Sequence, residues 1–428
     1  MKALVIDSGG RGGALLWKLA QSSRIKKLYV APGNGGTHRF AENVPIEPTE
    51  VEKLLQFVKK EKIDLTVASQ DDSLALGIAD AFQSYGLRIF APTRAAAEIE
   101  WSKVFGKEVM SRAGALTASC RIFDNYNDAV DYAWEHSGRK FVKADGLAKG
   151  KGAYDCLTFK SAQKAIYDIM VRRVHKNAGK KVLIEDFLEG QEVSIHAWCD
   201  GKNFILFPPS QDHKLSLDGD KGDNTGGMGT IAPVPCFSMD MMKEAGEKIV
   251  GPILRELDRM GRPFVGCLYP GLKMTPTGMK VLEFNARFGD PETQSYMRLL
   301  KTDLVDIMEA CIDGNLGKCK VEWHNYSAAC IVMASEGYPN DYKKSLGAPI
   351  SGIEEAEKIP GVVVFHAGTT MADGTLKTSG GRVLGVTARS VTLRDALETA
   401  YCAVERINFN GKQYRRDIGA KSLAMARF

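Results

Sequence analysis

Two side chains that could bind a metal ion, Glu283 and Asn285, lie two residues apart in an apolar run that begins at Val281. Alternate residues of a β-strand point to the same face, so a strand here would present both side chains together. Mg²⁺ prefers oxygen ligands of this kind, with phosphate and water completing its octahedral shell. Arg287 follows at once and offers a planar, two-pronged donor that suits a carboxylate. Taken alone, so short a pattern is more often an ordinary surface strand.

A glycine-rich and lysine-rich segment after Phe141 has the composition of a phosphate-binding loop. Lys143 precedes a loop over residues 146–152 that contains Gly150, Lys151 and Gly152. Backbone N–H groups with mobile cations above them can hold the phosphates of a nucleotide. The segment does not match the P-loop pattern G-x-x-x-x-G-K-[ST], and a solvated basic hairpin is the alternative interpretation.

A third polar segment runs from residue 210 to 235, and we predict a long loop dense in glycine and aspartate. The residues in it that could contact a substrate are Asp212, His213, Lys214, Asn224, Thr225, Gly226 and Gly227. Ordering so long a loop costs conformational entropy, which bound ligands can offset, so the sequence favours a substrate-binding role. A single histidine such as His213 is more often a structural hydrogen-bonding group.

Two glycine-rich segments follow the first two apolar runs of the chain. Residues 9–13 contain four glycines and come after the run 3–6, while the segment 32–37 comes after the run 27–31. Their spacing does not match G-x-G-x-x-G, and Asp7 stands where that fingerprint would begin. The first loop is therefore either a tight structural turn or, together with the second, part of a small-ligand crevice at one sheet edge.

The elements that would carry these groups divide the chain into three regions. Apolar strands predicted at 3–6, 27–31, 65–68 and 88–91 alternate with helices at 51–60 and 74–85, which indicates a doubly wound parallel sheet. The last hundred residues have an α+β pattern. We therefore predict an α/β N-terminal domain over 1–105, a central domain over 106–325 and an α+β C-terminal domain over 326–428.

The composition excludes several classes of protein. The 428 residues are 44% hydrophobic and 25% charged, which is ordinary globular usage and argues against a disordered chain. The net charge is only +5 and the basic residues are dispersed, which argues against nucleic acid as a partner. The nine cysteines form no Cys-x-x-Cys pair, so we expect a reducing compartment and no zinc site. No apolar run reaches the roughly 18 residues of a membrane span, and we expect a cytoplasmic protein without membrane contact.

The segments described above, taken in order, resemble the phosphoribosylamine–glycine ligase family, the glycinamide ribonucleotide synthetases of purine biosynthesis in the ATP-grasp superfamily. The resemblance covers essentially the whole chain and rests on residues 9–11, 32–37, 102–103, 143–152, 184–188, 210–214, 224–229, 283–292 and 366–369. It implies an N-terminal domain for the amine, a central ATP-grasp domain and a C-terminal domain packed against the active site. The family joins a carboxylate to an amine with ATP through an acyl phosphate, giving an amide, ADP and phosphate.

The resemblance also implies roles for individual residues. ATP would be bound by Lys103, Lys143, Gly150, Lys151, Gly152, Glu185, Leu188 and Glu192. Mg²⁺ or Mn²⁺ would be bound by Glu283 and Asn285. Catalysis would involve Arg287, Asp212, His213 and Lys214, and glycine or its acyl phosphate would contact Asn224, Thr225, Gly226, Gly227 and Asp290. The amine would contact Gly10, Arg11, Asn34, Gly36, Thr37 and Asp71. We expect a monomer or homodimer whose partners are small molecules.

The departures from the family pattern lie in the N-terminal region. The family's Gly-Gly-Arg-Glu-His-Ala is Gly-Gly-Arg-Gly-Gly-Ala over residues 9–14, and its Gly-Pro-Glu-x-Pro-Leu is Ser-Gln-Asp-Asp-Ser-Leu over 69–74. Asp7 replaces a glycine. Unit charges 4 Å apart interact by about 4 kcal/mol at an effective dielectric constant of 20, so the new acids Asp7, Asp71 and Asp72 would oppose a phosphorylated amine. Two hypotheses follow: tolerated drift in a ligase for glycine and phosphoribosylamine, or a different amine that lacks the phosphate or is cationic.

Two other classes of protein fit the sequence less well. A non-catalytic nucleotide-binding relative would be favoured by loss of Lys143, Glu283, Asn285 or Arg287, and all four are present. An NAD or nucleotide-sugar enzyme built on the first region would leave the middle region without a role. We therefore predict an ATP-dependent carbon–nitrogen ligase.

Overall fold

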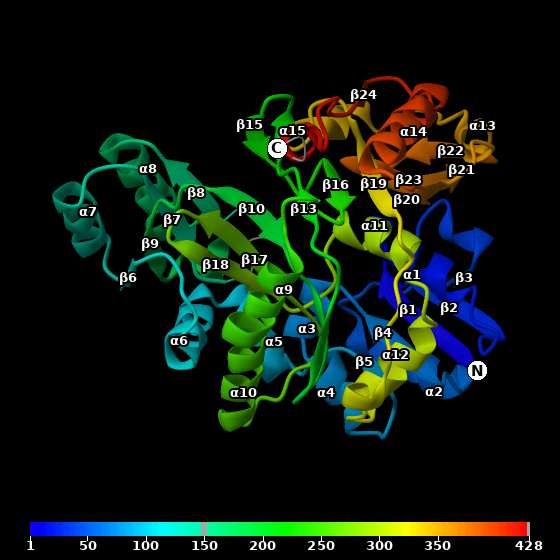
Figure 1. The fold of residues 1–428 in the computed structure, drawn as a ribbon, viewed down its shortest axis with the longest axis horizontal. Helices are drawn as coiled ribbons and strands as arrows, with labels where there is room; N and C mark the ends of the chain where they lie inside the picture. The colour runs from blue at the N-terminus through cyan, green and yellow to red at the C-terminus, as the bar shows by residue number, and fades with distance from the viewer. Residues whose placement is uncertain (147–151, 426–428) are drawn as a thin grey trace.

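The computed structural model describes residues 1–146 and 152–425 and shows the three predicted sheet-centred regions (Figure 1). The N-terminal sheet, drawn in blue, and the C-terminal sheet, drawn in orange, lie at one side of the molecule. The helices α7 (Tyr126–Glu135) and α8 (Phe159–Met170) lie at the opposite end. The long hairpin of β17 (Val265–Thr275) and β18 (Gly278–Asn285) lies between them.

The N-terminal region is a parallel sheet with the strand order β3-β2-β1-β4-β5, which confirms the predicted topology. Its strands are β1 (Lys2–Asp7), β2 (Lys27–Pro32), β3 (Glu42–Asn43), β4 (Leu65–Ala68) and β5 (Ile89–Phe90). The strand order reverses between β1 and β4, because β2 adds on one side of β1 and the later strands add on the other. Ligands of such sheets bind outside the carboxyl ends of the strands at this reversal.

The helices of the N-terminal region differ from the prediction at one place. They are α1 (Gly10–Leu19), α2 (Val51–Glu61), α3 (Asp71–Ala75), α4 (Ile78–Gln83) and α5 (Arg94–Trp101). The single helix predicted over 74–85 is wrong, because Gly77 separates α3 from α4 with a φ of +78°. Glycine adopts this left-handed conformation readily, and it ends a helix.

The central region contains two antiparallel sheets joined by helices. The first sheet has the order β6-β9-β7-β8, and the second has the order β10-β17-β11-β12 with β18 on β17. The remaining strands are β6 (Cys120–Phe123), β7 (Lys140–Ala144), β8 (Ala153–Cys156), β9 (Val182–Asp186), β10 (Gln191–Ser194), β11 (Ala197–Asp200) and β12 (Phe204–Leu206). The remaining helices are α6 (Lys103–Ala113), α9 (Met239–Ala245), a π-helical turn (Gly246–Val250), α10 (Gly251–Arg259), α11 (Glu292–Leu299) and α12 (Leu304–Ile312).

The C-terminal sheet incorporates a segment that the sequence predicted to be a loop. Its order is β13-β16-β19-β23-β20, with β24 on β19. Its strands are β13 (Gln211–Asp212), β16 (Gly229–Ala232), β19 (Ser327–Ser335), β20 (Val362–His366), β23 (Arg382–Ser390) and β24 (Lys412–Gln413). The loop predicted over 210–235 is therefore wrong: it contains β13 and β16 and a hairpin of β14 (Leu215–Leu217) and β15 (Lys221–Asn224). These strands have two to four residues each and pair with partners up to a hundred residues away, so no local pattern reveals them.

The other C-terminal elements pack around this sheet. They are a hairpin of β21 (Thr369–Ala372) and β22 (Thr375–Thr378) with the helices α13 (Ile353–Glu357), α14 (Leu393–Arg406) and α15 (Ala420–Met425). Short 3-10 turns lie at Thr37–Arg39, Lys176–Gly179, Leu316–Lys318 and Tyr342–Ser345. No helix among the described residues is long and apolar enough to cross a membrane.

Helix α1 is buried on nearly all sides and joins the three regions. Its preceding strand, β1, is buried on both faces, as expected for the centre of a parallel sheet. The helix packs against α11 of the central region and β20 of the C-terminal sheet. The start of α1 therefore lies where all three regions meet, next to the reversal of strand order.

Candidate active site

Two cavities that contain charged side chains adjoin one another. The larger, of about 530 Å³, is lined by residues of both central sheets, including Lys143, Glu185 and Glu192. The smaller, of about 320 Å³, is lined by Arg11 and Asp71 of the N-terminal region and by residues of the central and C-terminal regions. The residues that line both cavities are Asp212, Lys214, Asn224 and Glu283. A ligand in one cavity would therefore lie within reach of a ligand in the other.

A buried group of charges forms one wall of the larger cavity. The Lys143 Nζ lies 2.8 Å from one Glu185 oxygen, and the Lys107 Nζ lies 3.4 Å from the other. All three side chains are less than 9% exposed. Burial lowers the pKa of Lys107, although Glu185 partly offsets this effect. Glu185, which we predicted to contact adenine, thus also compensates the charge of Lys143, which we predicted to bind phosphate. Lys107 belongs to the same buried charged group, and the sequence did not indicate it.

A second charged group lies where the cavities adjoin. Lys214 lies 3.4 Å from Glu192 and 4.0 Å from Glu283, and Lys273 donates to Glu192 at 3.2 Å. Burial acts to raise the pKa of Glu192, but the two lysines together have a larger, opposite effect. The pKa of Glu192 therefore lies below its ordinary value. The neighbouring carboxylates, Glu192 first, raise the pKa of Lys214. Lys214 is therefore a fixed cation between the nucleotide-sized cavity and the smaller one.

Glu283 and Asn285 carry the oxygens that suit a divalent cation. Both lie on β18 and line the smaller cavity, which confirms that the two-residue spacing places them on one face. Burial acts to raise the pKa of Glu283, but Lys214, Lys103 and Lys143 together have a larger, opposite effect. The pKa of Glu283 therefore lies below its ordinary value, and the ionised carboxylate is favoured. No group of three or more acidic, histidine or cysteine side chains in the described residues could hold a metal. One carboxylate and one amide oxygen are donors that fit Mg²⁺ or Mn²⁺, with phosphate oxygens supplying other ligands.

Arg287 is held by two carboxylates at the edge of the smaller cavity. Its guanidinium lies 3.3 Å from Asp71 and 3.1 Å from Glu100. Burial raises the pKa of Glu100 to about 7 despite Arg287. Burial also acts to raise the pKa of Asp71, but Arg287 and Arg11 together with hydrogen bonds outweigh it, so this pKa lies below its ordinary value. Glu100 was not indicated by the sequence, because nothing local marks it; its carboxylate also accepts from the Ala286 N–H across 186 residues of chain.

An acidic pair lies on the opposite wall. Burial, followed by the nearby charge of Glu292, raises the pKa of Asp212 well above its ordinary value. Glu292 accepts a hydrogen bond of 2.6 Å from the Tyr269 hydroxyl. Burial and Glu292 therefore favour the protonated form of Asp212, which lessens the negative charge that faces a cavity that must receive anions. Tyr269 and Glu292 are further wall residues that the sequence did not single out.

His213 has a structural position next to this wall. Its Nε2 accepts from the Gly419 N–H at 3.0 Å, so its Nδ1 is the nitrogen that donates to the Gly229 carbonyl. Burial lowers the pKa of His213 to about 4. Both ring nitrogens are thus bonded to backbone groups, and its catalytic role stays a prediction without geometric support.

The neutrality of His213 has a consequence for stability. A histidine that stays neutral when folded and titrates near 6.5 when unfolded destabilises the fold as pH falls from 6.5 to 4, by about 3 kcal/mol in total. We expect His213→Gln to make the free energy of unfolding less dependent on pH over this range. Urea unfolding at several pH values measures this, with His38→Gln, the same change at an exposed position, as the control. A pH dependence as steep in His213→Gln as in the unsubstituted chain would contradict the assignment.

The other predicted residues are placed as follows. Leu188 lines the larger cavity. Lys103 is the first residue of α6, and its positive charge helps to lower the pKa of Glu283. Asn224, Thr225, Gly226 and Asp290 line the smaller cavity, and Gly227 packs against Asp212 and Pro291. The Gly152 carbonyl accepts from the Ala144 N–H at 2.8 Å. Gly150 and Lys151 lie outside the described residues.

The predicted amine-binding residues separate into two groups. Arg11 and Asp71 line the smaller cavity. Asn34 and Gly36 instead join the N-terminal and C-terminal regions: the Asn34 amide donates to the His366 carbonyl at 2.9 Å, and Gly36 lies against the His366 ring. Thr37 bonds within the N-terminal region, to Asn34 and Asn43. Gly10 packs against Gln294 of α11. Residues 10–13 of the first glycine-rich segment form the first turn of α1, where Gly10 and Gly12 allow close neighbours while Arg11 lines the smaller cavity.

Two antiparallel sheets enclosing a nucleotide-sized cavity, with a second cavity at its mouth, define an ATP-grasp protein. Residues 101–293 match the model of the phosphoribosylglycinamide synthetase ATP-grasp (A) domain. Residues 1–100 match the N domain of the same synthetase, and residues 328–421 match its C domain. The chain belongs to the phosphoribosylglycinamide synthetase family.

Individual relatives agree over the full length of the chain. A phosphoribosylamine–glycine ligase of Caldanaerobacter subterraneus is 44% identical over 98% of this chain and 100% of its own. One of Rhodopirellula baltica is 44% identical over 99% of this chain and 98% of its own. The crystal structure of the phosphoribosylamine–glycine ligase of Thermotoga maritima has a TM-score of 0.86, with 31% identity over 97% of this chain and 100% of that chain.

Proposed function

We propose that this chain joins glycine to 5-phosphoribosylamine with ATP, giving glycinamide ribonucleotide, ADP and phosphate. The observation that carries the proposal is the pair of adjoining cavities, with Lys214 and Glu283 at their junction. The larger cavity suits a nucleotide, and the smaller suits a carboxylate and an amine. The relatives that are named for this reaction are similar over the whole chain.

The first step would form an acyl phosphate at the junction. A glycine carboxylate oxygen attacks the terminal phosphorus of ATP, the bond to the bridging oxygen breaks, and ADP leaves. Lys214 and Lys143 compensate the phosphate charge, and little covalent chemistry falls to the protein. Glu283 and Asn285 would hold Mg²⁺ or Mn²⁺, which supplies charge neutralisation on the phosphates when bound.

The second step would form the amide in the smaller cavity. The amine attacks the acyl carbon, phosphate leaves, and the nitrogen loses a proton. Arg287 is fixed by Asp71 and Glu100 and would orient the glycine carboxylate before its activation. The raised pKa of Asp212 would lessen its repulsion with the acyl phosphate. The protein's main contribution is then the placement of reacting atoms.

The case for a different amine rested on uncompensated acids near the phosphate. Asp7 instead pairs with Arg11 at 2.7 Å, and Asp71 pairs with Arg287 at 3.3 Å. Two of the three new acids therefore have a cationic partner, and the repulsion they would exert on an anion is largely compensated. A glycine ligase acting on phosphoribosylamine is thus compatible with the altered segments.

Turnover with defined substrates tests the proposed function. We expect ADP formation to require both glycine and phosphoribosylamine, with glycinamide ribonucleotide detected by mass spectrometry. Ribosylamine without phosphate and simple cationic amines serve as alternative acceptors. Turnover only with one of these would contradict the proposed amine, and no acid-dependent ADP formation with any pair would contradict ligase activity.

A further inference from the structure

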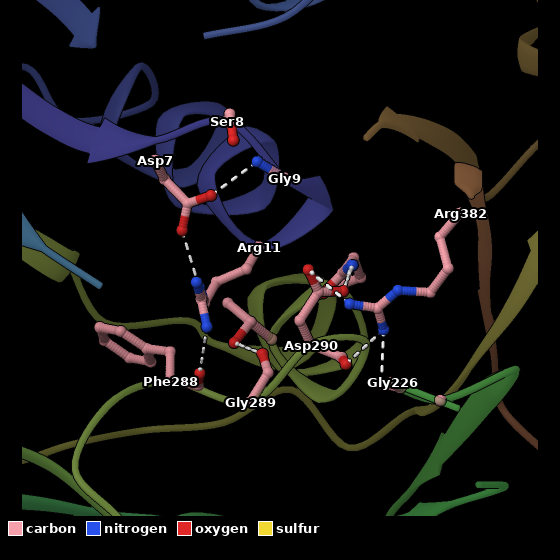
Figure 2. Close-up of polar contacts among 12 residues, drawn as sticks. Asp7, Ser8, Gly9, Arg11, Gly226, Phe288, Gly289, Asp290 and Arg382 are labelled. Carbon is pink, nitrogen blue, oxygen red and sulfur yellow. Dashed lines mark hydrogen bonds and ion pairs between the residues drawn. The ribbon is translucent and has the colours of Figure 1, made fainter. Parts of the chain in front are cut away.

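The positions at which this chain departs from its family gather around one buried carboxylate. Asp7, at the carboxyl end of β1, is 1% exposed. It accepts hydrogen bonds from the Ser69 hydroxyl at 2.7 Å and from the Gln70 amide at 3.1 Å, and both donors follow β4. It also accepts from the Gly9 N–H at 2.6 Å (Figure 2). Three of the departures, Asp7, Ser69 and Gln70, are therefore directly connected by hydrogen bonds.

Gly12 completes this cluster by leaving space for Asp7. A Cβ at position 12 would lie 2.5 Å from the Asp7 Cβ and 2.9 Å from its carboxyl carbon. A side chain at position 12 would thus displace the aspartate. With glycine at position 7, a side chain at position 12 would instead occupy the space that Asp7 fills. We therefore expect that a carboxylate at position 12 can replace Asp7 but cannot coexist with it.

The partner that this carboxylate orients is Arg11. Its Nε donates to Asp7 at 2.7 Å, and its Nη1 donates to the Phe288 carbonyl at 3.0 Å (Figure 2). A guanidinium has five N–H groups, so these two bonds leave three for other acceptors. Arg11 is 7% exposed and lines the smaller cavity beside the reversal of strand order between β1 and β4. That is where sheets of this type bind their ligands.

We propose that Asp7 is a positioning residue, which fixes Arg11 so that its remaining N–H groups recognise the phosphate of the amine substrate. This inference rests on the proposed function. A long cationic side chain that is already fixed loses less conformational freedom when it binds a ligand than a mobile one does. Ser69, Gln70 and Gly12 support the same geometry through Asp7.

The segment that accepts from Arg11 is also held from the C-terminal region. Arg382, at the start of β23, donates to the Asp290 and Gly226 carbonyls (Figure 2). Arg287 donates a second hydrogen bond to the Phe288 carbonyl. Loss of the Asp7–Arg11 bond would therefore leave residues 288–290 in place. We expect the effect to be confined to the amine and not to reach ATP.

Affinity for glycinamide ribonucleotide tests the inference, because this product carries the same ribose phosphate. Calorimetry should show that glycinamide ribonucleotide binds Asp7→Asn at least tenfold more weakly than the unsubstituted chain. It should bind Ser69→Ala about fourfold more weakly, because this change removes the hydroxyl that donates to Asp7. ATP affinity should stay within twofold of the unsubstituted chain for both. The KM for the amine should rise while kcat at saturating amine changes less than threefold.

The exchange of positions supplies a rescue. Gly12→Glu alone should weaken product binding at least tenfold, and Asp7→Gly combined with Gly12→Glu should restore binding to within threefold. Unchanged product affinity in folded Asp7→Asn and Ser69→Ala, or equal losses for product and ATP, would overturn the positioning role. If the unsubstituted chain binds ATP but not the product, the proposed function fails, which is a different result from normal product binding in every variant.

Discussion

Glu283→Gln is expected to lower kcat/KM at least a thousandfold, which corresponds to about 4 kcal/mol of transition-state stabilisation. Glutamine keeps the size of the side chain but loses the negative oxygen that would bind the divalent cation. Lys214, 4.0 Å away, would lose one of its compensating carboxylates and shift toward Glu192. Initial rates over a range of Mg²⁺ concentrations measure both effects, and the concentration for half-maximal rate should rise at least tenfold.

The matched control is Glu189→Gln, the same change at an exposed position just after β9. It should leave the rate and the Mg²⁺ dependence unchanged. If Glu283→Gln retained the Mg²⁺-dependent rate of the unsubstituted chain, the metal assignment would be wrong, whatever the reaction proved to be.

The parallel N-terminal sheet was predictable because its strands are continuous apolar runs. Residues 3–6 and 65–68 are buried on both faces, and a continuous apolar run of this kind predicts a buried strand from the local sequence alone. The strands at 211–212 and 229–232 carry no such signal, because they are stabilised by pairing with β19 and its neighbours much later in the chain. The break at Gly77 was also missed, since glycine is tolerated within helical patterns.

The site was predictable where one strand or one short segment carries it. Glu283 and Asn285 needed only strand periodicity, and Lys214 needed only its motif. Glu100 could not be found, because it meets Arg287 through tertiary structure alone. Asp7 was noticed but interpreted as a source of repulsion, since the sequence does not show that Arg11 one helical turn later folds back to compensate it. The effect of a charged residue on a site can therefore be predicted only when the residue that it pairs with is known.

Lys143→Met is expected to abolish ATP turnover, with a loss of at least a thousandfold, and also to destabilise the central region. Lys143 is the nearer of the two lysines that compensate the buried Glu185. Removing Lys143 loses a charged hydrogen bond to the buried Glu185, which keeps only the more distant Lys107, and this loss costs about 1.5–3 kcal/mol. Thermal unfolding with and without ATP, together with initial rates, measures the two losses separately.

Lys143→Met combined with Glu185→Gln distinguishes a phosphate ligand from a structural lysine. The double variant also removes the carboxylate that Lys143 compensates, and it leaves Lys107, whose pKa burial already lowers. The unfolding midpoint should therefore recover in part, while turnover and ATP-induced stabilisation stay absent. Lys140→Met is the control, because it is the same change on the same strand with a partner, Asp186, that is about half exposed. Its stability should change by less than about 1 kcal/mol, with normal turnover. If the double variant recovered turnover along with stability, Lys143 would matter only as the counter-charge of Glu185, and the nucleotide's phosphates would have to be held by other cations of the cavity.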